Sequence, residues 1–190
     1  MALLPGGSVG RTLFVPLVGG RVSPLSRWRC KGRALRRGVL GDLDDIVRIE
    51  RLCFADGAWK VEDLEKQFDY SFAKILVFDD SFGESGEPPS AVGFLLFWET
   101  GDEVQLMRLG VEPHFQGQGI GSMLLNHLVT ESDRRRTYTL EVRESNDGAR
   151  TFYRRLGFND IAVRQRYYSD GENAILMQRR IEEVVEKSTV

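Results

Sequence analysis

Cysteine and histidine are scarce in this chain of 190 residues, which has two of each. Cys30 and Cys53 lie far apart, form no C-x-x-C motif and have no histidine close by in the sequence. A structural zinc site needs four such ligands, so no metal site is expected. The two thiols are interpreted as reduced cysteines of an intracellular protein, because a disulfide framework would need more of them.

Long apolar runs are also missing. The run at residues 13–18 is too short to span a bilayer and is interrupted by Pro16. A secretory signal would need one longer apolar stretch followed by a small-residue cleavage site. Neither a membrane span nor a secretory signal is therefore predicted.

Acidic side chains are absent from residues 1–41, which carry eight of the 26 basic residues. The other 18 basic residues face all 28 acidic ones, so residues 42–190 form an acidic region. An acidic domain argues against direct binding of nucleic acid and suits a cationic acceptor such as an amine or a protein N-terminus.

Residues 1–32 differ in composition from the rest and are read as a basic extension. An organellar transit peptide, a disordered extension and an over-long assigned translation start all fit that composition. The expected location is the cytoplasm, or an organelle matrix or stroma if the extension is a transit peptide. A single domain is predicted over residues 33–180, acting as a monomer or weak oligomer, followed by a charged tail at 181–190.

Hydrophobic periodicity predicts the elements of this domain. A strand near residues 33–36 precedes a helix over 41–51, which Asp42 or Asp44 could cap. The further predictions are a helix at 61–68; strands at 74–78, 91–98, 103–111 and 137–142; a loop at 79–90; a helix from Ile120 closed by the arginines 134–136; a helix at 146–156 ended by Gly157; and strands at 161–167 and 173–179. The strands at 91–98 and 103–111 read as a hairpin, so the mixed α/β fold cannot be a fully parallel nucleotide-binding fold.

The strongest local motif is the glycine-rich segment 116–121, which joins a strand to a helix. Glycines at 117, 119 and 121 allow an anion to approach the backbone, and the first N–H groups of a helix attract negative charge. The G-x-G-x-G spacing is not the dinucleotide fingerprint, and no Gly-Lys-Ser/Thr follows. A phosphate site is favoured, with a tight turn that binds nothing as the alternative.

The motif Gln116-x-x-Gly119-x-Gly121 resembles the acetyl-CoA signature of the GNAT superfamily of N-acetyltransferases. Three further blocks, at residues 140–146, 149–158 and 166–174, resemble one branch of it, the RimI-type protein N-terminal acetyltransferases that act on ribosomal protein bS18. The resemblance covers about residues 33–180. It implies the GNAT fold, an α/β (α+β) arrangement whose mixed, mostly antiparallel sheet has splayed strands and is flanked by helices.

The resemblance also implies acetyl-CoA as co-substrate, with no metal. Backbone groups of a bulged strand would face the acetyl-pantetheine arm, the glycine-rich loop would hold the pyrophosphate, and one asparagine would add a contact. The implied residues are Leu109, Gly110, Val111, Gly117, Gln118, Gly119, Ile120, Gly121, Ser122 and Asn146.

Two side chains match the catalytic residues of the family. Glu141 matches its general base and Tyr153 its general acid, while the alternatives are an exposed acid at a strand end and a plain core aromatic. The N–H of Val111 would stabilise the oxyanion. Gln105 stands where many GNAT enzymes carry a glutamate, and Glu103 lies at the hairpin end, which favours Glu141 as the base.

The implied activity is acetylation of a protein N-terminus, such as the N-terminal alanine of bS18. Acetylation of lysine side chains or small amines, and a non-catalytic acetyl-CoA-binding module, are the alternatives. Residues 54–60 lack the proline that the family often has beside its peptide site, and Asn173 replaces a more usual acid. Tyr167 and Tyr168 are read either as part of the peptide groove or as ordinary strand aromatics.

Overall fold

The computed structural model describes residues 29–30, 33–80, 90–131 and 136–181. Residues 1–28 of the predicted extension, 182–190 of the predicted tail, most of the predicted loop at 79–90 and Arg134 and Arg135 lie outside the described residues. The elements are β1 (Arg29–Cys30), β2 (Arg33–Arg37), η1 (Leu40–Asp42), α1 (Leu43–Phe54), η2 (Ala55–Gly57), α2 (Val61–Glu65), η3 (Lys66–Phe68), β3 (Ala73–Asp80), β4 (Ser90–Thr100), β5 (Glu103–Val111), η4 (Pro113–Phe115), α3 (Ile120–Glu131), β6 (Thr137–Arg143), α4 (Asp147–Arg155), β7 (Asn159–Arg164) and β8 (Ala174–Arg180).

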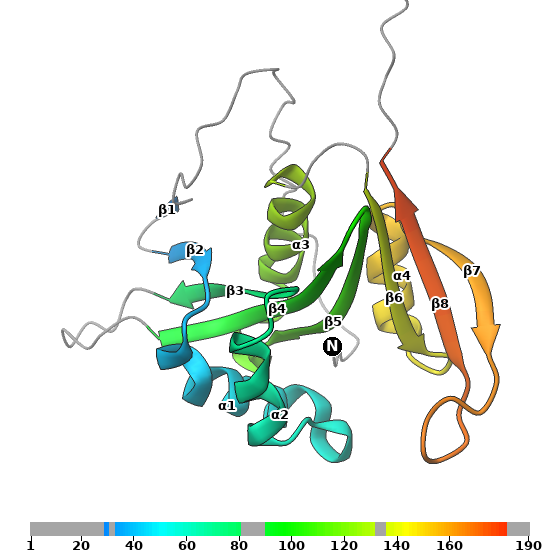
Figure 1. The fold of residues 1–190 in the computed structure, drawn as a ribbon, viewed down its shortest axis with the longest axis horizontal. Helices are drawn as coiled ribbons and strands as arrows, with labels where there is room; N and C mark the ends of the chain where they lie inside the picture. Colours follow the sequence, from blue (N-terminus) through cyan, green and yellow to red (C-terminus); the bar gives the residue numbers. More distant parts are fainter. Residues whose placement is uncertain (1–28, 31–32, 81–89, 132–135, 182–190) are drawn as a thin grey trace, which may run out of the picture.

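The described strands form one sheet in the order β1-β2-β3-β4-β5-β6-β8-β7 (Figure 1). Every neighbouring pair is antiparallel except β5 and β6, which run parallel. The predicted hairpin of β4 and β5 is present, with Thr100 opposite Glu103. The mixed, mostly antiparallel sheet confirms the predicted fold class.

Two apolar cores lie on opposite faces of the sheet. Side chains of α3 and α4 pack on one face, against a core that runs from β2 to β8. Side chains of α1 and α2 pack on the other, against residues of β3 and β4. Among the described residues, this second core takes nothing from β6, β7 or β8, so the half of that face formed by these strands is left without a helical cover.

β5 and β6 pair over only part of their length. Their pairing runs from Glu103–Thr137 to Leu106–Leu140 and ends there. The register of β5 against β4 shifts at the same point, because Leu96 pairs with Arg108 while Phe97 pairs with Leu106, which leaves Met107 as a bulge. A bulge bends its strand, and here the two strands part beyond it (Figure 1). We call the open space between 107–111 and 141–143 the fork.

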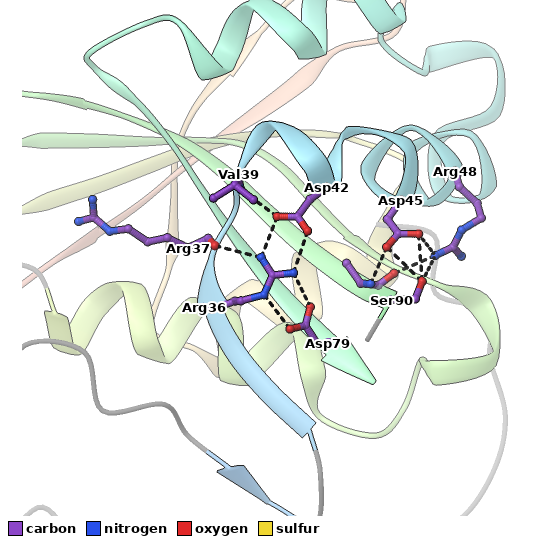
Figure 2. Close-up of polar contacts among 9 residues, drawn as sticks. Arg36, Arg37, Val39, Asp42, Asp45, Arg48, Asp79 and Ser90 are labelled. Carbon is purple, nitrogen blue, oxygen red and sulfur yellow. Dashed lines mark hydrogen bonds and ion pairs between the residues drawn. The ribbon is translucent and has the colours of Figure 1, made fainter. Parts of the chain in front are cut away.

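A buried charge network fixes α1 against the sheet edge (Figure 2). The guanidinium of Arg36 on β2 donates to both carboxylate oxygens of Asp42, at 2.8 and 2.7 Å, and to both of Asp79, at 2.7 and 3.0 Å. The hydrogen bond to Asp42, above all, raises the pKa of Arg36. Two bidentate contacts of this kind hold β2, β3 and the start of α1 in one geometry.

That network corrects one prediction. The side chain of Asp42 does not cap α1; its Oδ2 accepts from the backbone N–H of Val39 at 2.8 Å, and both of its oxygens accept from Arg36. A carboxylate with a buried arginine in reach gains more from this charge-assisted pair than from a cap. The capping prediction failed because the partner lies on a different element.

The last strands also differ in extent. β7 ends at Arg164, earlier than the predicted strand at 161–167, because Arg166 has φ 52° and turns the chain. The backbone N–H of Arg166 donates to Asn173 Oδ1 at 2.9 Å, which closes that turn. Tyr167 and Tyr168 therefore lie in the turn 165–173 between β7 and β8 and are not strand aromatics.

Candidate functional site

The edge of β5 that faces the fork carries backbone groups with no strand beside them. Glu112 N donates to Val92 O at 2.9 Å, and the groups of successive residues point to opposite edges of a strand. The N–H groups of Leu109 and Val111 therefore point into the fork, whereas those of Gly110 point towards β4. Of the three predicted backbone contacts, Leu109 and Val111 have the required direction.

The carbonyl of Val111 is already satisfied. Gln116 Nε2 donates to it at 2.8 Å, and Cys53 Sγ donates to it at 3.2 Å. The first glutamine of the glycine-rich motif thus ties the loop back to the end of β5. Burial raises the pKa of the Cys53 thiol, so this cysteine stays a neutral donor.

The glycine-rich loop enters α3 through two left-handed residues. Gly117 has φ 76° and Gly119 has φ 85°, and an added Cβ at either position would meet nothing within 4 Å. Backbone conformation therefore requires these glycines, because side chains disfavour that region. The hydrogen bond from Met123 N to Gly119 O is 2.9 Å, so the N–H groups before Met123 lie at the free N-terminus of the helix.

Gly121 lies where α3 passes α4 and β5. A Cβ at this position would lie 3.4 Å from the Phe152 ring of α4 and 3.9 Å from Leu109, which are ordinary contact distances. The predicted role of Gly121 in the phosphate site stays a prediction. Asn146 caps α4, because its Oδ1 accepts from Ala149 N at 3.0 Å.

Glu141 lies at the fork on the face of the sheet that also carries α1 and α2. Its neighbours Leu140 and Val142 point into the opposite core, and side chains alternate along a strand. The Glu141 side chain is 12% exposed and forms an ion pair with Arg164 at 3.0 Å. A hydrogen bond to Glu141 is the main cause of the raised pKa of Tyr167.

Tyr153 lies on the opposite face of the sheet. It belongs to α4, is 7% exposed and packs edge-on against Phe152 and Phe158. Burial, together with the nearby Tyr168, raises its pKa well above the ordinary value, so the phenol keeps its proton. Glu141 also acts on the pKa of Tyr168, so Tyr168 lies near both Glu141 and Tyr153, which belong to opposite faces of the sheet.

Two walls flank the Glu141 side of the fork. One is the segment 54–59, which links α1 to α2, and the other is the turn 165–173. Arg143 fixes this turn through ion pairs with Asp170 at 2.7 Å and Glu172 at 2.6 Å, and its guanidinium lies 4.0 Å from the centre of the Tyr168 ring. Asn173 Nδ2 donates to Glu144 at 2.9 Å, so the amide at position 173 has its own structural role.

Sequence reasoning missed several residues that the fold brings to this region. Arg164 pairs with the predicted base, and Arg108 projects from the bulge of β5 towards a buried carboxylate, Glu50. An arginine inside the otherwise apolar stretch 106–111 was the available signal for Arg108. Arg164 gave no local signal, since it precedes a turn on an exposed strand.

Neither a metal site nor a membrane span appears in the part of the chain that the structure describes. No group of three or more His, Cys, Asp or Glu side chains there could hold a metal ion. None of the described helices is long and apolar enough to cross a bilayer.

The chain is similar to known proteins in sequence and in structure. The profile of the acetyltransferase (GNAT) family matches residues 43–158. The [ribosomal protein bS18]-alanine N-acetyltransferase of Salmonella typhimurium is 34% identical over 134 residues, which are 63% of this chain and 86% of that protein. Its Escherichia coli K12 counterpart is 46% identical over 81 residues, 40% of this chain and 55% of that protein.

Solved structures agree with the sequence matches. The crystal structure of the ribosomal-protein-S18-alanine N-acetyltransferase from Escherichia coli has a TM-score of 0.69 to this chain at 28% identity. The match covers 83% of this chain and 99% of that one. The similarity therefore extends over most of this chain and almost all of that structure.

Proposed function

Because the chain belongs to the acetyltransferase (GNAT) family and is an N-acetyltransferase of its RimI-type branch, we propose that it acetylates the N-terminal amine of a protein. The acceptor we propose is an N-terminal alanine such as that of ribosomal protein bS18, which the names of the relatives specify for those proteins. The proposal is supported by the similarity to these relatives, together with Glu141 and Tyr153 on opposite faces of the sheet, each near Tyr168. We also propose the cytoplasm as the site of action.

The donor side of the fork suits acetyl-CoA. GNAT acetyltransferases use this co-substrate, which supplies the acetyl group as an activated thioester. The unpaired N–H groups of Leu109 and Val111 would hold the acetyl-pantetheine arm along the edge of β5. The N-terminus of α3, opened by Gly117 and Gly119, would hold the pyrophosphate. Asn146 would contribute through its side-chain amide in addition to its capping oxygen.

The acceptor amine must lose a proton before it can attack. Glu141, on the face that carries the two walls, would take that proton directly or through a water molecule. The nitrogen then forms a bond to the thioester carbon, and the Val111 N–H would donate to the oxygen that gains negative charge.

Collapse of the adduct breaks the carbon–sulfur bond. Tyr153 would give its phenolic proton to the departing sulfur, and the products are the N-acetylated chain and coenzyme A with a free thiol. The raised pKa of Tyr153 keeps the proton in place until the sulfur needs it. The nitrogen gives up its second proton, which passes through solvent to the Tyr153 phenolate, and Glu141 releases the first proton to solvent, so both groups are restored.

The acceptor walls favour an extended chain end over an isolated small molecule. The 54–59 segment and Tyr168 stand on either side of the Glu141 face, and Tyr167 is hydrogen bonded to Glu141 itself. An amine attached to a peptide would reach Glu141 between them, with its backbone along the walls. The acidic charge of residues 42–190 would attract the ammonium form to this site.

The test is a panel of acceptors offered with acetyl-CoA to the purified full chain. The panel contains peptides that begin with Ala, peptides whose N-terminus is blocked but which carry an internal lysine, and polyamines. We expect mass spectrometry to find acetyl groups on the free N-terminus of the Ala peptides. Transfer confined to lysine or polyamines would refute the N-terminal assignment, and tight coenzyme A binding without any transfer would refute the enzymatic one.

A further inference from the structure

Arg108 occupies an unusual place for a charged side chain. It follows the bulge at Met107, at the point where β5 leaves β6, and its side chain is 19% exposed. The bulge resets the alternation of β5, since Leu106 and Leu109 both belong to the core on the α3 and α4 face. Arg108 is thereby turned to the other face, where Glu50 of α1 is fully buried.

Arg108 and Glu50 together hold the 54–59 segment. Arg108 Nε lies 3.2 Å from Glu50 Oε1, and Arg108 Nη2 donates to the carbonyl of Gly57 at 2.8 Å. The same Glu50 oxygen accepts from the backbone N–H of Trp59 at 2.9 Å. The pair thus binds the segment through the carbonyl of Gly57 and the N–H of Trp59.

Two aromatic rings complete this arrangement. The Arg108 guanidinium carbon lies 4.6 Å from the centre of the Phe54 ring and 5.0 Å from that of Trp59. Guanidinium groups bind the faces of aromatic rings favourably at such distances. Arg108 is therefore the common contact of the segment's first residue, its middle and its last.

The other wall of the fork lies close to the same side chain. Tyr168 is half-buried, which raises its pKa, while the positive charges of Arg143 and Arg108 act to lower it. Tyr168 is thus placed near two guanidinium groups, one from each side of the fork. Arg108 contacts the wall at 54–59 directly, and its charge reaches Tyr168 of the wall at 165–173.

Stability alone does not explain a buried ion pair here. Burial raises the pKa of Glu50 and lowers that of Arg108, so both groups lose hydration that their attraction must offset. Glu50 Oε2 has no hydrogen-bond partner among the described residues. Well-packed apolar side chains are often as stable as such a pair, whereas a pair fixes one geometry.

We propose that Arg108, held by Glu50, is the specificity-determining residue of the acceptor site, because it holds the 54–59 wall in one position beside the face that carries Glu141. This inference rests on the proposed N-terminal acetylation. A wall held in one position would favour the small N-terminal alanine of the proposed acceptor over a large first residue. Loss of the Arg108 contacts frees the wall, weakens binding of the correct peptide and relaxes the choice of its first residue.

The test compares Arg108→Met, Arg108→Lys and Glu50→Gln with the wild-type chain. Peptides that begin with Ala and Leu serve as acceptors, and kcat and KM are measured for each peptide and for acetyl-CoA. Lysine keeps the charge beside Glu50 but lacks the fork that reaches Gly57 and stacks on the rings. Arg136→Met is the matched control, since the Arg136 side chain is about as exposed as that of Arg108 and pairs with Glu99 at 2.8 Å, outside the fork.

We expect Arg108→Met to raise the KM for the Ala peptide about tenfold and to reduce the preference for Ala over Leu by a similar factor. The KM for acetyl-CoA should stay within about twofold, and Arg108→Lys should recover part of the loss. In the double variant with Glu50→Gln, the effects should be less than multiplicative, because one contact is shared. Folding of Arg108→Met is judged by melting and coenzyme A binding. If this variant does not fold, the peptide KM and the preference for Ala in Arg108→Lys and Glu50→Gln test the proposal.

The inference is overturned if the folded variants keep the wild-type peptide KM and the wild-type preference for Ala. It is also overturned if Arg136→Met gives the same change. Hydrogen exchange at the Trp59 amide, measured by NMR, separates this inference from the proposed function. Absence of any acetyl transfer by the wild-type chain would refute the proposed function. Faster exchange at the Trp59 amide in Arg108→Met would still support a wall held by Arg108. Unchanged exchange at this amide would refute the wall.

Discussion

The two halves of the β5–β6 pair are built from the same strands and differ in almost every other respect. In the paired half, Val104 and Leu106 lie beside Tyr138 and Leu140, and all four are buried in one core. In the open half, no strand among the described residues pairs with this edge of β5. This half carries charged side chains, Arg108 on β5 and Glu141 on β6. One bulge at Met107 separates a structural half from a chemical half.

The difference teaches how a sheet can provide a reaction site. The N–H and C=O groups of a buried strand normally form hydrogen bonds with a neighbouring strand. Here the strands part, so the N–H groups of Leu109 and Val111 are available for a ligand, and the opening can be reached from both faces. The paired half holds the geometry, and the open half would carry out the acetyl transfer.

The largest expected effect is on the base in the open half. Glu141→Gln should lower kcat for the Ala peptide by about 10²–10⁴-fold, because the amide cannot take the proton of the amine. Glu103→Gln is the matched control in the paired half, where Glu103 accepts a hydrogen bond from Thr139 at 3.1 Å. Steady-state kinetics measures both, and equal losses in the two variants would contradict the contrast between the halves.

The acid should show a smaller effect of the same kind. Tyr153→Phe should lower kcat by about 10²-fold, because the departing thiolate must then take its proton from water. Tyr138→Phe removes a hydroxyl from the buried paired half and should leave kcat within a few-fold of the wild type. Calorimetric titration should give both variants the wild-type affinity for coenzyme A. A wild-type kcat in Tyr153→Phe would show that Tyr153 is not the general acid and is only a core aromatic.

The donor loop can be compared with the hairpin turn at the paired end. Gly119→Ala places a side chain at φ 85°, and the strain of about 1–2 kcal/mol should raise the KM for acetyl-CoA by about 5–30-fold. Gly101→Ala creates similar strain at φ 59° in the β4–β5 turn. Its thermal stability should fall while its KM for acetyl-CoA stays the same. A shared rise in KM would show that strain alone, wherever it lies, weakens donor binding.

The smallest expected effect is on alkaline stability. The pKa of Tyr153 is raised in the folded chain, while an unfolded tyrosine titrates near 10. The native state therefore keeps a proton that the unfolded state loses, so this stabilisation is complete below pH 10 and falls as the pH rises towards the native pKa. At pH 10.5, ionisation of Tyr153 in the unfolded state should lower the free energy of unfolding by about 0.8 kcal/mol. Urea unfolding of the wild type and Tyr153→Phe between pH 8 and 10.5 measures the difference, and parallel curves would contradict it.

Local sequence determined most of the elements and the donor loop. The apolar run at 91–98, the hairpin after it and the helix after the glycines were predicted from periodicity and are present as β4, β5 and α3. Left-handed φ at Gly117 and Gly119 follows from glycine itself. These features depend on neighbours within a few positions, and a single sequence records such neighbours directly.

Contacts between distant residues could not be predicted in the same way. Asp42 is predicted to cap a helix, but Arg36, which also binds Asp79, takes both of its carboxylate oxygens. The pairing of Glu141 with Arg164 and of Glu50 with Arg108 joins residues 23 and 58 positions apart. Nothing local marks such partners, because their energy exists only when the sheet has formed.

The sequence by itself therefore determined which chemical groups this protein owns: a glycine loop before a helix, an acid at the end of one strand and a tyrosine on the next helix. The tertiary structure alone decided that β5 and β6 part at Met107, with the acid and the tyrosine on opposite faces of the sheet. The physical reason is that a strand's hydrogen-bonding edge is fixed by its neighbour across the sheet, and that neighbour lies far away in the sequence.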